Sequence, residues 1–340
     1  MFILQGFFIL KTKFLIIRFS SIGDIVLTSP VVRCLKTQFP EAEIHYLTKK
    51  RNADLLQANP YIDQIHLLDD SLSKTIRELK AQRFDFIIDL HNNIRSLRVK
   101  LALQTRSVSF NKLNFRKFFL TRLKLNLMPE MHIVDRNMAT LSRFNIANDG
   151  RGLEHFIPEE DEFSIDELPG NFRNGYVALV LAGTYFTKRM PAAKYKGLIT
   201  GTDYPFVLLG GKSERLLADE IRSWGTTNVA DFTGKLRFNQ SASLVKNARL
   251  VIANDTGLMH IAAAFHKKIL SVWGNTTPEL GMYPYLPGAG SEILEVKGLK
   301  CRPCSKLGYH ECPQKHFRCM MDIPEENIIE WVKREFTASK

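Results

Sequence analysis

Hydrophobic positions along the chain follow two alternating patterns, short apolar runs typical of buried strands and longer stretches with helical spacing. In the first half, strands are expected at 14–19, 43–48, 64–69, 84–91 and 107–110. Helices are expected between and after them, at 24–38, 52–59, 71–82, 94–104 and 134–144. This repeated order of strand and helix predicts a parallel sheet with helices on both faces.

The alternation restarts after 145–175, a stretch rich in Gly, Pro, Asn and acidic residues with little periodicity. Strands are expected at 176–182, 205–209, 250–254 and 269–273, and helices at 192–199, 213–224, 240–247, 258–265 and 325–336. The fold class is therefore predicted to be α/β, with doubly wound domains at 1–160 and 161–322 and a C-terminal helix at 323–340 that could pack back on the N-terminal domain. Ligands of such sheets bind at the carboxyl ends of the strands, which predicts a cleft between the domains.

The composition is that of a globular protein large enough to bury two cores, with 340 residues, 45% hydrophobic and 24% charged. No apolar run reaches the roughly 20 residues that cross a bilayer. The N-terminus, MFILQGFFIL, is apolar but lacks the basic start and the cleavage site of a signal peptide. We expect it to be an extra edge segment or to precede the true first strand, and we expect a cytoplasmic protein.

Basic residues are distributed unevenly over this chain, which has a net charge of +12. The segment 92–126 holds nine Lys and Arg residues and no Asp or Glu, with Phe and Leu between them. Such a surface attracts phosphates, nucleic acid or an acidic membrane face, although a solvated basic helix face is the simpler alternative. The complete lack of acids favours a functional surface. The basic residues are Arg95, Arg98, Lys100, Arg106, Lys112, Arg116, Lys117, Arg122 and Lys124.

Three familiar nucleotide-binding motifs are missing from the chain. No G-x-G-x-x-G follows the first strand, which argues against a dinucleotide site. The letters GGKS at 210–213 end like a phosphate-binding P-loop, but Phe206 occupies the position of its first glycine. No D-x-D triplet is present to hold a metal ion on a nucleotide-sugar diphosphate. The remaining candidates are three loops at strand ends.

The first loop reads FSSIGDIVLTSP at 19–30 and joins a strand to a helix. Gly23 allows the backbone to approach a ligand closely. Asp24 stands at the start of the helix, which it could stabilise by about 1 kcal/mol as a cap or first-turn acid. Alternatively, its carboxylate could act as a general base on a hydroxyl group.

The second loop, LAGTYFTKRMP at 181–191, follows the first strand of the second domain. Thr187 offers a hydrogen-bond donor, and Lys188 and Arg189 could neutralise a diphosphate. A basic loop close to a helix start is the alternative, and this stretch alone favours neither.

The third loop lies in VIANDTGLMHIAAA at 251–264, where a strand turns directly into a helix. The free N–H groups and the dipole of that helix make an anion site, in which Thr256 and Gly257 could place a phosphate oxygen. Asp255 could cap the helix or hold a sugar hydroxyl or an acceptor. His260 is either a packed histidine or a residue of the site.

Taken together, RFSSIGDIVLTSPVVRCLK, TKRMPAAKY and NDTGLMHIAAAF…SVWGNTTPE resemble the glycosyltransferase family 9 heptosyltransferases, which build the inner core of bacterial lipopolysaccharide. The likeness extends from Phe14 to about Trp331. It implies a GT-B fold, in which two Rossmann-like domains face a cleft, and inverting, metal-independent transfer of a heptose from ADP-heptose. It also implies a lipid-anchored saccharide acceptor, no cofactor, no nucleic-acid partner and a place at the cytoplasmic face of the inner membrane.

The resemblance assigns roles to the matching positions. Asp24 is implied to be the catalytic base, and Lys188 is implied to bind the departing diphosphate. The positions implied to bind the donor are Gly23, Thr187, Glu214, Asp255, Thr256, Gly257 and His260. For the phosphates and acidic sugars of the acceptor we expect Arg95, Arg98, Arg116 and Lys117 of the N-terminal domain. Met190 stands where the family often has an aromatic residue, which leaves another nucleotide sugar open.

Four of the five cysteines lie close together near the C-terminus, at Cys301, Cys304, Cys312 and Cys319. The spacing C-x₂-C-x₇-C-x₆-C is compatible with a structural zinc ion, with a redox-sensitive clip or with reduced structural thiols. Because the cluster is far along the chain from the three loops, we assign it no chemistry and expect no catalytic metal.

Two other functions compete with glycosyl transfer. An enzyme of another type that processes nucleotide sugars on the same scaffold, such as an epimerase, would leave the basic stretch without a role. A non-catalytic protein that binds polyanions would explain the charge but neither Asp24 nor the helix start at Asp255–Gly257.

Overall fold

The computed structural model describes residues 12–68 and 70–338, so the expectation for the apolar N-terminal stretch lies outside the described residues. By its internal contacts the chain divides into two units. The first unit consists of Met1–Lys112 and Ile133–Pro158, and the second consists of Leu113–His132 and Glu159–Lys340. None of the helices in the described part of the chain has the length and apolar character needed to cross a membrane.

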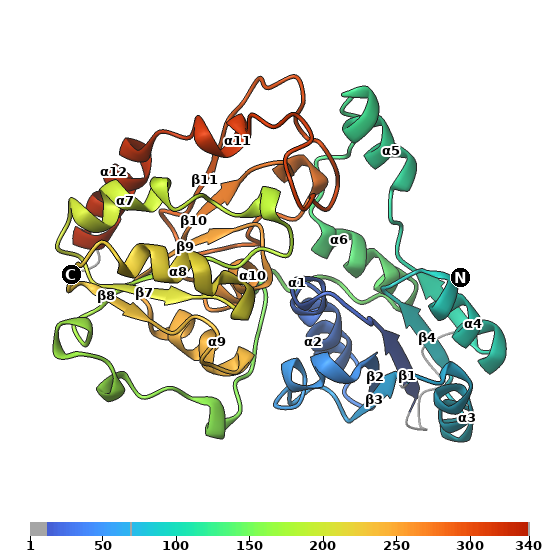
Figure 1. Cartoon of the computed structure of the whole chain (residues 1–340). Helices are drawn as coiled ribbons and strands as arrows, with labels where there is room; N and C mark the ends of the chain where they lie inside the picture. The colour runs from blue at the N-terminus through green and yellow to red at the C-terminus, as the bar shows by residue number, and fades with distance from the viewer. Residues whose placement is uncertain (1–11, 69, 339–340) are drawn as a thin grey trace. The chain divides into compact units, whose positions relative to one another are not determined.

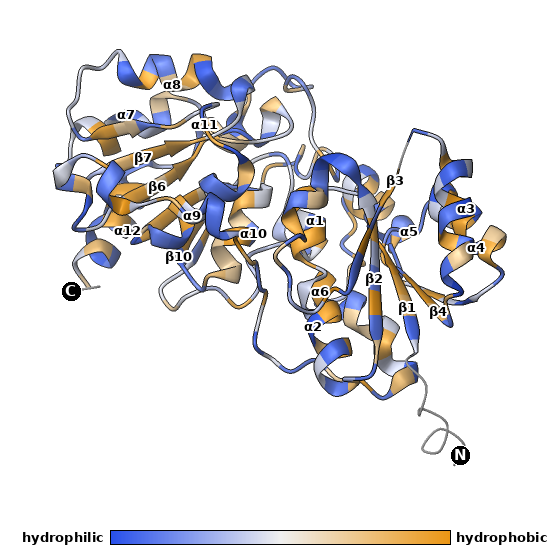
Figure 2. Cartoon of the chain, turned by 90° about the horizontal axis from the view of Figure 1, so that it is seen from below, coloured by the Kyte–Doolittle hydropathy of each residue, from blue (hydrophilic) through white to orange (hydrophobic). Residues whose placement is uncertain are grey.

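The first unit contains a parallel sheet in the order β3-β2-β1-β4-β5 (Figure 1). Its strands are β1 (Lys13–Ile17), β2 (Glu43–Lys49), β3 (Gln64–Leu68), β4 (Phe86–Asp89) and β5 (Arg106–Ser109). Its helices are α1 (Ile22–Val26), α2 (Ser29–Gln38), η1 (Lys50–Leu55), α3 (Leu72–Gln82), α4 (Ile94–Leu103), α6 (Ile133–Met138) and η3 (Ala139–Phe144). The central strand β1 is apolar throughout its buried part because helices cover both faces of the sheet (Figure 2).

The single helix expected at 24–38 is two helices in the structure. Helix α1 ends at Val26, and α2 starts at Ser29 with Pro30 in its first turn. Proline has no backbone N–H and fits the first turn of a helix but not its interior. Pro30 therefore begins a new helix instead of continuing the first.

The second unit contains a parallel sheet in the order β11-β10-β9-β6-β7-β8 (Figure 1). Its strands are β6 (Val177–Val180), β7 (Phe206–Leu209), β8 (Val229–Asp231), β9 (Leu250–Asn254), β10 (Lys268–Trp273) and β11 (Glu292–Glu295). The longer helices are α7 (Ala193–Thr200), α8 (Arg215–Arg222), α9 (Phe238–Asn247), α10 (Gly257–Ala264) and α12 (Glu325–Thr337). Short helical turns complete it, namely α5 (Asn114–Phe118), η2 (Phe119–Leu123), η4 (Glu159–Asp161), η5 (Ile165–Glu167), η6 (Gly170–Phe172), η7 (Phe186–Lys188), η8 (Lys212–Glu214), η9 (Pro278–Leu280) and α11 (Arg318–Met321).

The C-terminal helix α12 belongs to the second unit. Ile328, Trp331 and Val332 are buried in the same hydrophobic core as strands β6, β7, β9 and β10. The Trp331 indole N–H also donates to the Gly290 carbonyl at 2.9 Å. The sequence allowed this helix to pack on the N-terminal domain. In the structure, its apolar face packs against the core of the second unit.

The sequence predicted that all residues up to 160 belong to the N-terminal domain. In the structure, the contacts of the segment Leu113–His132 group it with the second unit. The ammonium group of Lys124 donates to the Pro303 carbonyl at 2.7 Å. The Nε2 atom of His132 lies 2.9 Å from the Tyr283 carbonyl oxygen. These partners are more than 150 positions away in the sequence, which hydrophobic periodicity cannot reveal.

Candidate functional site

The loop after β1 is organised around an ion pair between Arg18 and Asp24. The guanidinium Nη2 of Arg18 lies 2.5 Å from the Asp24 Oδ1 atom. The other carboxylate oxygen accepts hydrogen bonds from the backbone N–H and the hydroxyl of Ser21, at 3.0 and 2.7 Å. Arg18 is itself nearly buried and also donates to the carbonyls of Ser20 and Leu90. The carboxylate is thus fixed at the start of α1, with Gly23 buried beside it.

These contacts determine the protonation of Asp24. Burial raises the pKa of Asp24, but the charge of Arg18 and the hydrogen bonds from Ser21 and Arg18 outweigh it and hold the pKa at about 2. At neutral pH the group is ionised and can accept a hydrogen bond from a hydroxyl. Its low proton affinity limits how early in a reaction it takes the proton. The capping role considered for Asp24 is therefore observed, whereas the catalytic role stays a prediction.

Two further polar residues at this sheet edge were missed by the sequence analysis. Asp89, at the end of β4, is fully buried and pairs with Lys100 at 2.9 Å, and it also accepts a hydrogen bond from Ser96. The His91 ring packs against the Phe19 ring at a tilt of 58°, with ring centroids 4.8 Å apart. Burial and the nearby positive charges, Arg18 first among them, lower the pKa of His91 to about 4, so its ring is neutral at pH 7.

The signal that could have found them is the run DLHNN directly after a buried apolar strand. Because β4 is the neighbour of β1 in the sheet, its carboxyl end lies beside the loop of Asp24.

In the second unit, Lys188 and Asp255 come together from two neighbouring strand ends. The Lys188 ammonium lies 2.5 Å from Asp255 Oδ2, and the Thr276 hydroxyl donates to the same oxygen at 2.9 Å. Lys188 ends the turn η7 after β6, and Asp255 follows β9. Since β6 and β9 are adjacent parallel strands, the sheet itself brings the two loops together.

The start of α10 stands beside this ion pair. Thr256 is its N-cap residue, in an extended conformation, but its side chain does not cap the helix. Asp255, Thr256 and Gly257 are each partly exposed. Positive partial charge at the helix N-terminus and the Lys188 ammonium therefore meet at one place, which suits a phosphate or diphosphate. His260 is buried one turn further along the same helix, 2% exposed.

The hydroxyl of Thr187 forms a hydrogen bond to another part of the second unit. Thr187 is buried, and its Oγ1 accepts a hydrogen bond from the Tyr309 backbone N–H at 2.8 Å. The Thr187 N–H in turn donates to the Tyr309 carbonyl at 3.2 Å. Thr187 thus holds the loop of Lys188 in place, and its expected contact with the donor stays a prediction.

Glu214 links the same loop to the end of β7. The Arg189 guanidinium lies 2.8 Å from its Oε1, and the Gly211 N–H donates to its Oε2 at 2.9 Å. Ser213 donates to Oε1 as well, at 2.6 Å. The carboxylate, 4% exposed, is held by these protein groups. Its contact with the donor remains an expectation.

Asn254 is a supporting residue that the sequence analysis did not single out. It is buried at the end of β9, and its side-chain N–H groups point to the carbonyls of Val180 and Ala182, at 3.3 and 3.2 Å. Its side-chain oxygen accepts from the Met190 N–H at 3.1 Å. Asn254 therefore ties both ends of the 181–190 loop to the strand that precedes Asp255.

The cysteine-rich segment packs against the loop of Lys188, despite its distance along the chain. Gly308 has a φ of +128° and lies so close to Tyr185 that a β-carbon there would be 2.6 Å from the Tyr185 Cβ. The Cys304 N–H donates to the Asn275 carbonyl at 3.0 Å. Sequence distance was thus a poor guide to the place of the cluster, which adjoins the second-unit site.

The cysteines are free thiols in the described part of the chain. Burial, with Cys301 as the next cause, raises the pKa of Cys304 to about 11, and burial raises that of Cys319 to about 12. Both are therefore protonated at neutral pH, as expected of structural thiols. Within residues 12–68 and 70–338, no three Cys, His, Asp or Glu side chains are grouped as metal ligands. Cys312 is half-buried.

The residues expected to bind the acceptor are divided between the two units. Arg95 and Arg98 are exposed on α4 of the first unit, whereas Arg116 and Lys117 belong to α5 of the second. Lys117 also lines an open pocket of the second unit with Arg122, Lys306 and Tyr309. This pocket carries three basic side chains and no carboxylate, a lining suited to an anion.

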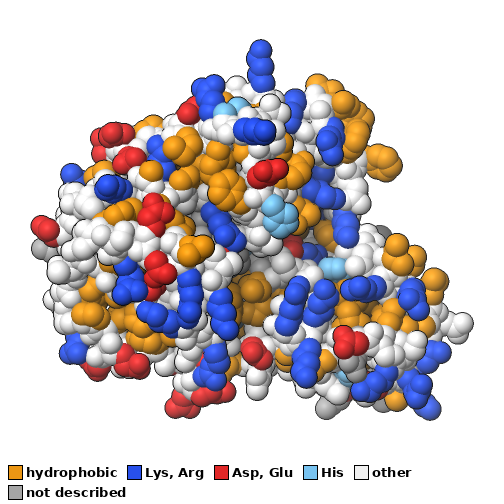
Figure 3. Space-filling model, viewed as in Figure 1, with side chains coloured by type: hydrophobic (Ala, Val, Ile, Leu, Met, Phe, Trp, Pro, Cys, Tyr) orange, Lys and Arg blue, Asp and Glu red, His pale blue; other side chains and the backbone are white. Residues whose placement is uncertain are grey.

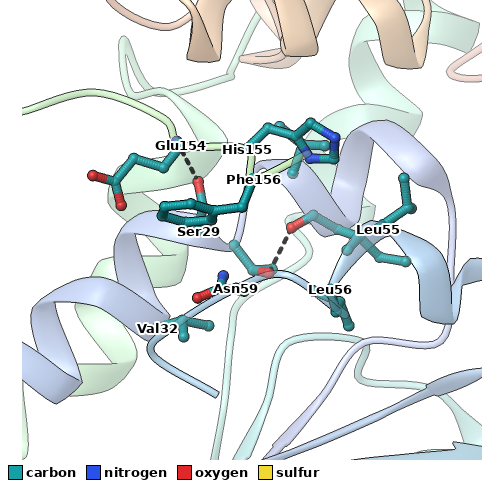
Figure 4. Close-up of a pocket in the computed structure, with 11 residues that line it drawn as sticks. Ser29, Val32, Leu55, Leu56, Asn59, Glu154, His155 and Phe156 are labelled. Carbon is teal, nitrogen blue, oxygen red and sulfur yellow. Dashed lines mark hydrogen bonds between the residues drawn. The ribbon is translucent and has the colours of Figure 1, made fainter. Parts of the chain in front are cut away.

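A smaller pocket lies in the first unit, between α2, the end of η1 and the segment 154–156 (Figure 4). There the Ser29 hydroxyl oxygen accepts a hydrogen bond from the Glu154 N–H at 2.9 Å. Val32, Leu55 and Phe156 provide apolar walls. None of the expected site residues lines this pocket, so we assign it no role.

Comparison with known proteins gives a consistent result. The model of the family described as glycosyltransferase family 9 (heptosyltransferase) matches residues 72–308. Lipopolysaccharide heptosyltransferase 1 of Campylobacter coli is 23% identical over 95% of this chain and 99% of its own length.

Two solved structures have the same fold. The glycosyl transferase family 9 structure from Veillonella parvula has a TM-score of 0.76 at 19% identity, covering 97% of this chain and 98% of the other. The ADP-heptose lps heptosyltransferase II of Escherichia coli has a TM-score of 0.72 at 18% identity, covering 96% and 99%. These matches and the two parallel sheets confirm the expected fold class, α/β of the GT-B type.

Proposed function

We propose, from the premise that the chain belongs to glycosyltransferase family 9, that this glycosyltransferase moves a heptose from ADP-heptose to a lipopolysaccharide core acceptor. The observation that carries the proposal is the Lys188–Asp255 pair beside the uncapped start of α10. A nucleotide-sugar diphosphate is the kind of anion that an ammonium group and helix N–H groups can bind together. The names of the related heptosyltransferases support heptose as the transferred sugar.

In the proposed reaction, the acceptor oxygen forms a bond to the anomeric carbon while the bond from that carbon to the diphosphate breaks. The leaving ADP takes the bonding electrons, and Lys188 and the N–H groups of α10 stabilise its charge. The acceptor proton passes to the Asp24 carboxylate. A single displacement of this kind inverts the anomeric configuration. The proposal includes no catalytic metal, so turnover should persist in a strong chelator.

For the acceptor, we propose that the basic side chains of the segment 92–126 bind core phosphates and acidic sugars. Arg95, Arg98 and Arg116 are exposed and suited to this contact. We propose accordingly that the reaction takes place at the cytoplasmic face of the inner membrane, where the enzyme would reach the lipid-anchored acceptor.

A panel of nucleotide sugars tests the donor. ADP-heptose should raise the melting temperature of the protein more than ADP-glucose, UDP-glucose or GDP-mannose. Of these four donors, only ADP-heptose should support transfer to core lipid extracted from a heptose-deficient strain. Arg95→Glu with Arg98→Glu should lower this transfer while leaving the stabilisation by ADP-heptose unchanged. Preference for a different nucleotide sugar in both assays would replace the proposed donor, and stabilisation by none of them would overturn the diphosphate site.

A further inference from the structure

The segment 113–131, called here the amphipathic segment, exposes an unusual amount of apolar surface. It includes α5, which has no buried residue, and η2, in which only Leu120 is buried among the described side chains. Phe115 is 84% exposed and Phe118 is 54% exposed. The other large exposed apolar residues of the segment are Leu123, Leu125, Leu127 and Met131. So dense a group of exposed apolar side chains marks a binding surface.

Positive charge accompanies this apolar surface. Arg116 and Arg122 are exposed and form no ion pair with any residue that the structure describes. No acidic residue occurs between 92 and 126, and Glu130 is the first acid within the segment. Figure 3 shows hydrophobic side chains, with Lys and Arg side chains next to them, where Figure 1 places α5.

The base of the amphipathic segment is fastened to the second unit. The Lys124 ammonium donates to the carbonyls of Pro303 and Cys301, at 2.7 and 3.2 Å. These hydrogen bonds hold the part of the segment around Lys124, whereas the apolar tip around Phe115 stays exposed. A fixed base with an apolar, cationic tip is an arrangement that suits docking on a flat surface.

We propose that the amphipathic segment docks the enzyme on an anionic lipid bilayer, with Phe115 and Phe118 inserted among the headgroups and Arg122 contacting lipid phosphates. Aromatic and aliphatic side chains beside basic ones are the composition of segments that lie in a membrane interface. Each basic residue near an anionic leaflet contributes about 1 kcal/mol of attraction. A second copy of the chain is a poorer occupant, because a symmetric contact would bring Arg116 and Arg122 close to their own counterparts.

The inference adds a lipid surface to the proposed function and rests on it only for the presence of an anionic bilayer near the enzyme. Vesicles without any saccharide acceptor test it. A failure to bind vesicles leaves the donor experiments unaffected, and a wrong donor leaves vesicle binding unaffected.

The experiment is cosedimentation of the full chain with vesicles of phosphatidylcholine alone or of phosphatidylcholine with phosphatidylglycerol. The protein should bind the anionic vesicles, and added salt should weaken binding. Phe115→Ser with Phe118→Ser should lower the partition coefficient by at least roughly tenfold, because two apolar anchors are lost. Arg122→Ser should lower it by roughly fivefold.

Leu216→Ser is the matched control, because Leu216 on α8 is also 84% exposed but has no place in the amphipathic segment. Its partition coefficient should equal that of the unaltered protein. A Phe115→Trp variant should shift its emission to the blue on anionic vesicles, whereas Leu216→Trp should not. Equal binding of the Phe115/Phe118 variant and the unaltered protein would overturn the proposal. So would binding to neither vesicle, or a dimer that the Phe substitutions dissociate.

Discussion

Thr187 and Tyr309 are joined by a reciprocal pair of contacts across 122 positions of sequence, with the Tyr309 N–H donating to the Thr187 hydroxyl and the Thr187 N–H donating to the Tyr309 carbonyl. This pair connects the loop of Lys188 to the cysteine-rich segment. The position of the Lys188 ammonium therefore depends on a segment that contributes no residue to the ion pair itself.

The first prediction concerns this connection. Thr187→Val keeps the side-chain shape but leaves the Tyr309 N–H without its acceptor, which should lower the free energy of unfolding by about 1 kcal/mol. Because the Lys188 loop loses a support, KM for the nucleotide sugar should rise severalfold. Urea unfolding and initial rates measure both. Thr187→Ser restores the hydroxyl and should recover most of each effect; if it does not, the hydroxyl is not the cause.

The second prediction concerns Asp24. Asp24→Asn should lower kcat by roughly 10²–10⁴-fold, because an amide cannot take up the proton of the acceptor hydroxyl. Binding of ADP should change little. The matched control is Asp149→Asn, because Asp149 also pairs with an arginine, Arg33, and its pKa is also about 2. Both variants should lose stability, but only Asp24→Asn should lose turnover; equal activity of the two would remove Asp24 from the chemistry.

The third prediction concerns the diphosphate site. Lys188→Ala should weaken donor binding by roughly ten- to a hundredfold, because it removes a cation and leaves the Asp255 carboxylate to repel the diphosphate. Adding Asp255→Asn removes that repulsion and should recover part of the affinity. Titration calorimetry with ADP measures both. Lys235→Ala, at a more exposed Lys–Asp pair of the same unit, should leave the affinity unchanged. Additive losses in the double variant would contradict the proposed coupling.

The fourth prediction concerns His91 and pH. The pKa of His91 is about 4 in the folded protein and about 6.5 in an unfolded chain, so the unfolded state binds the proton more strongly. Folding stability should therefore fall as pH decreases from about 6.5 to about 4, by on the order of 2 kcal/mol from this residue.

His91→Gln removes this contribution. Urea unfolding at several pH values should show that the variant loses less stability than the unaltered protein over this range. His66, whose pKa is also about 4, remains in both proteins and so cancels in the comparison. If both proteins lost the same stability over this pH range, His91 would not be buried as a neutral ring.

Much of the fold could be predicted from local pattern, and the reasons for the exceptions are physical. The central strands are continuous apolar runs because both faces of their sheets are covered. Strands β8 and β11 were missed because they are short edge strands with partly exposed side chains and no strong apolar run. The break between α1 and α2 follows from Pro30, which a pattern of apolar spacing does not weigh.

The site was predictable only in part. Lys188, Asp255 and Thr256 follow buried strands, and the rule that ligands bind at carboxyl ends identifies such positions. Tyr309 carries no such signal, because its importance comes from its contact with Thr187, which is 122 positions away in the sequence. Arg18, His91 and Asn254 do stand at the ends of buried strands, but the pattern of residues does not reveal their partners.

By itself, the sequence determined the alternation of strands and helices, the three strand-end loops and the basic segment without acids, since these depend on residue type and local spacing. Tertiary structure alone decided the partners. It placed β1 beside β4 and β6 beside β9, and so brought His91 close to Arg18 and Lys188 close to Asp255. The physical reason is that pKa values and anion binding depend on distance in space, which is set by strand order.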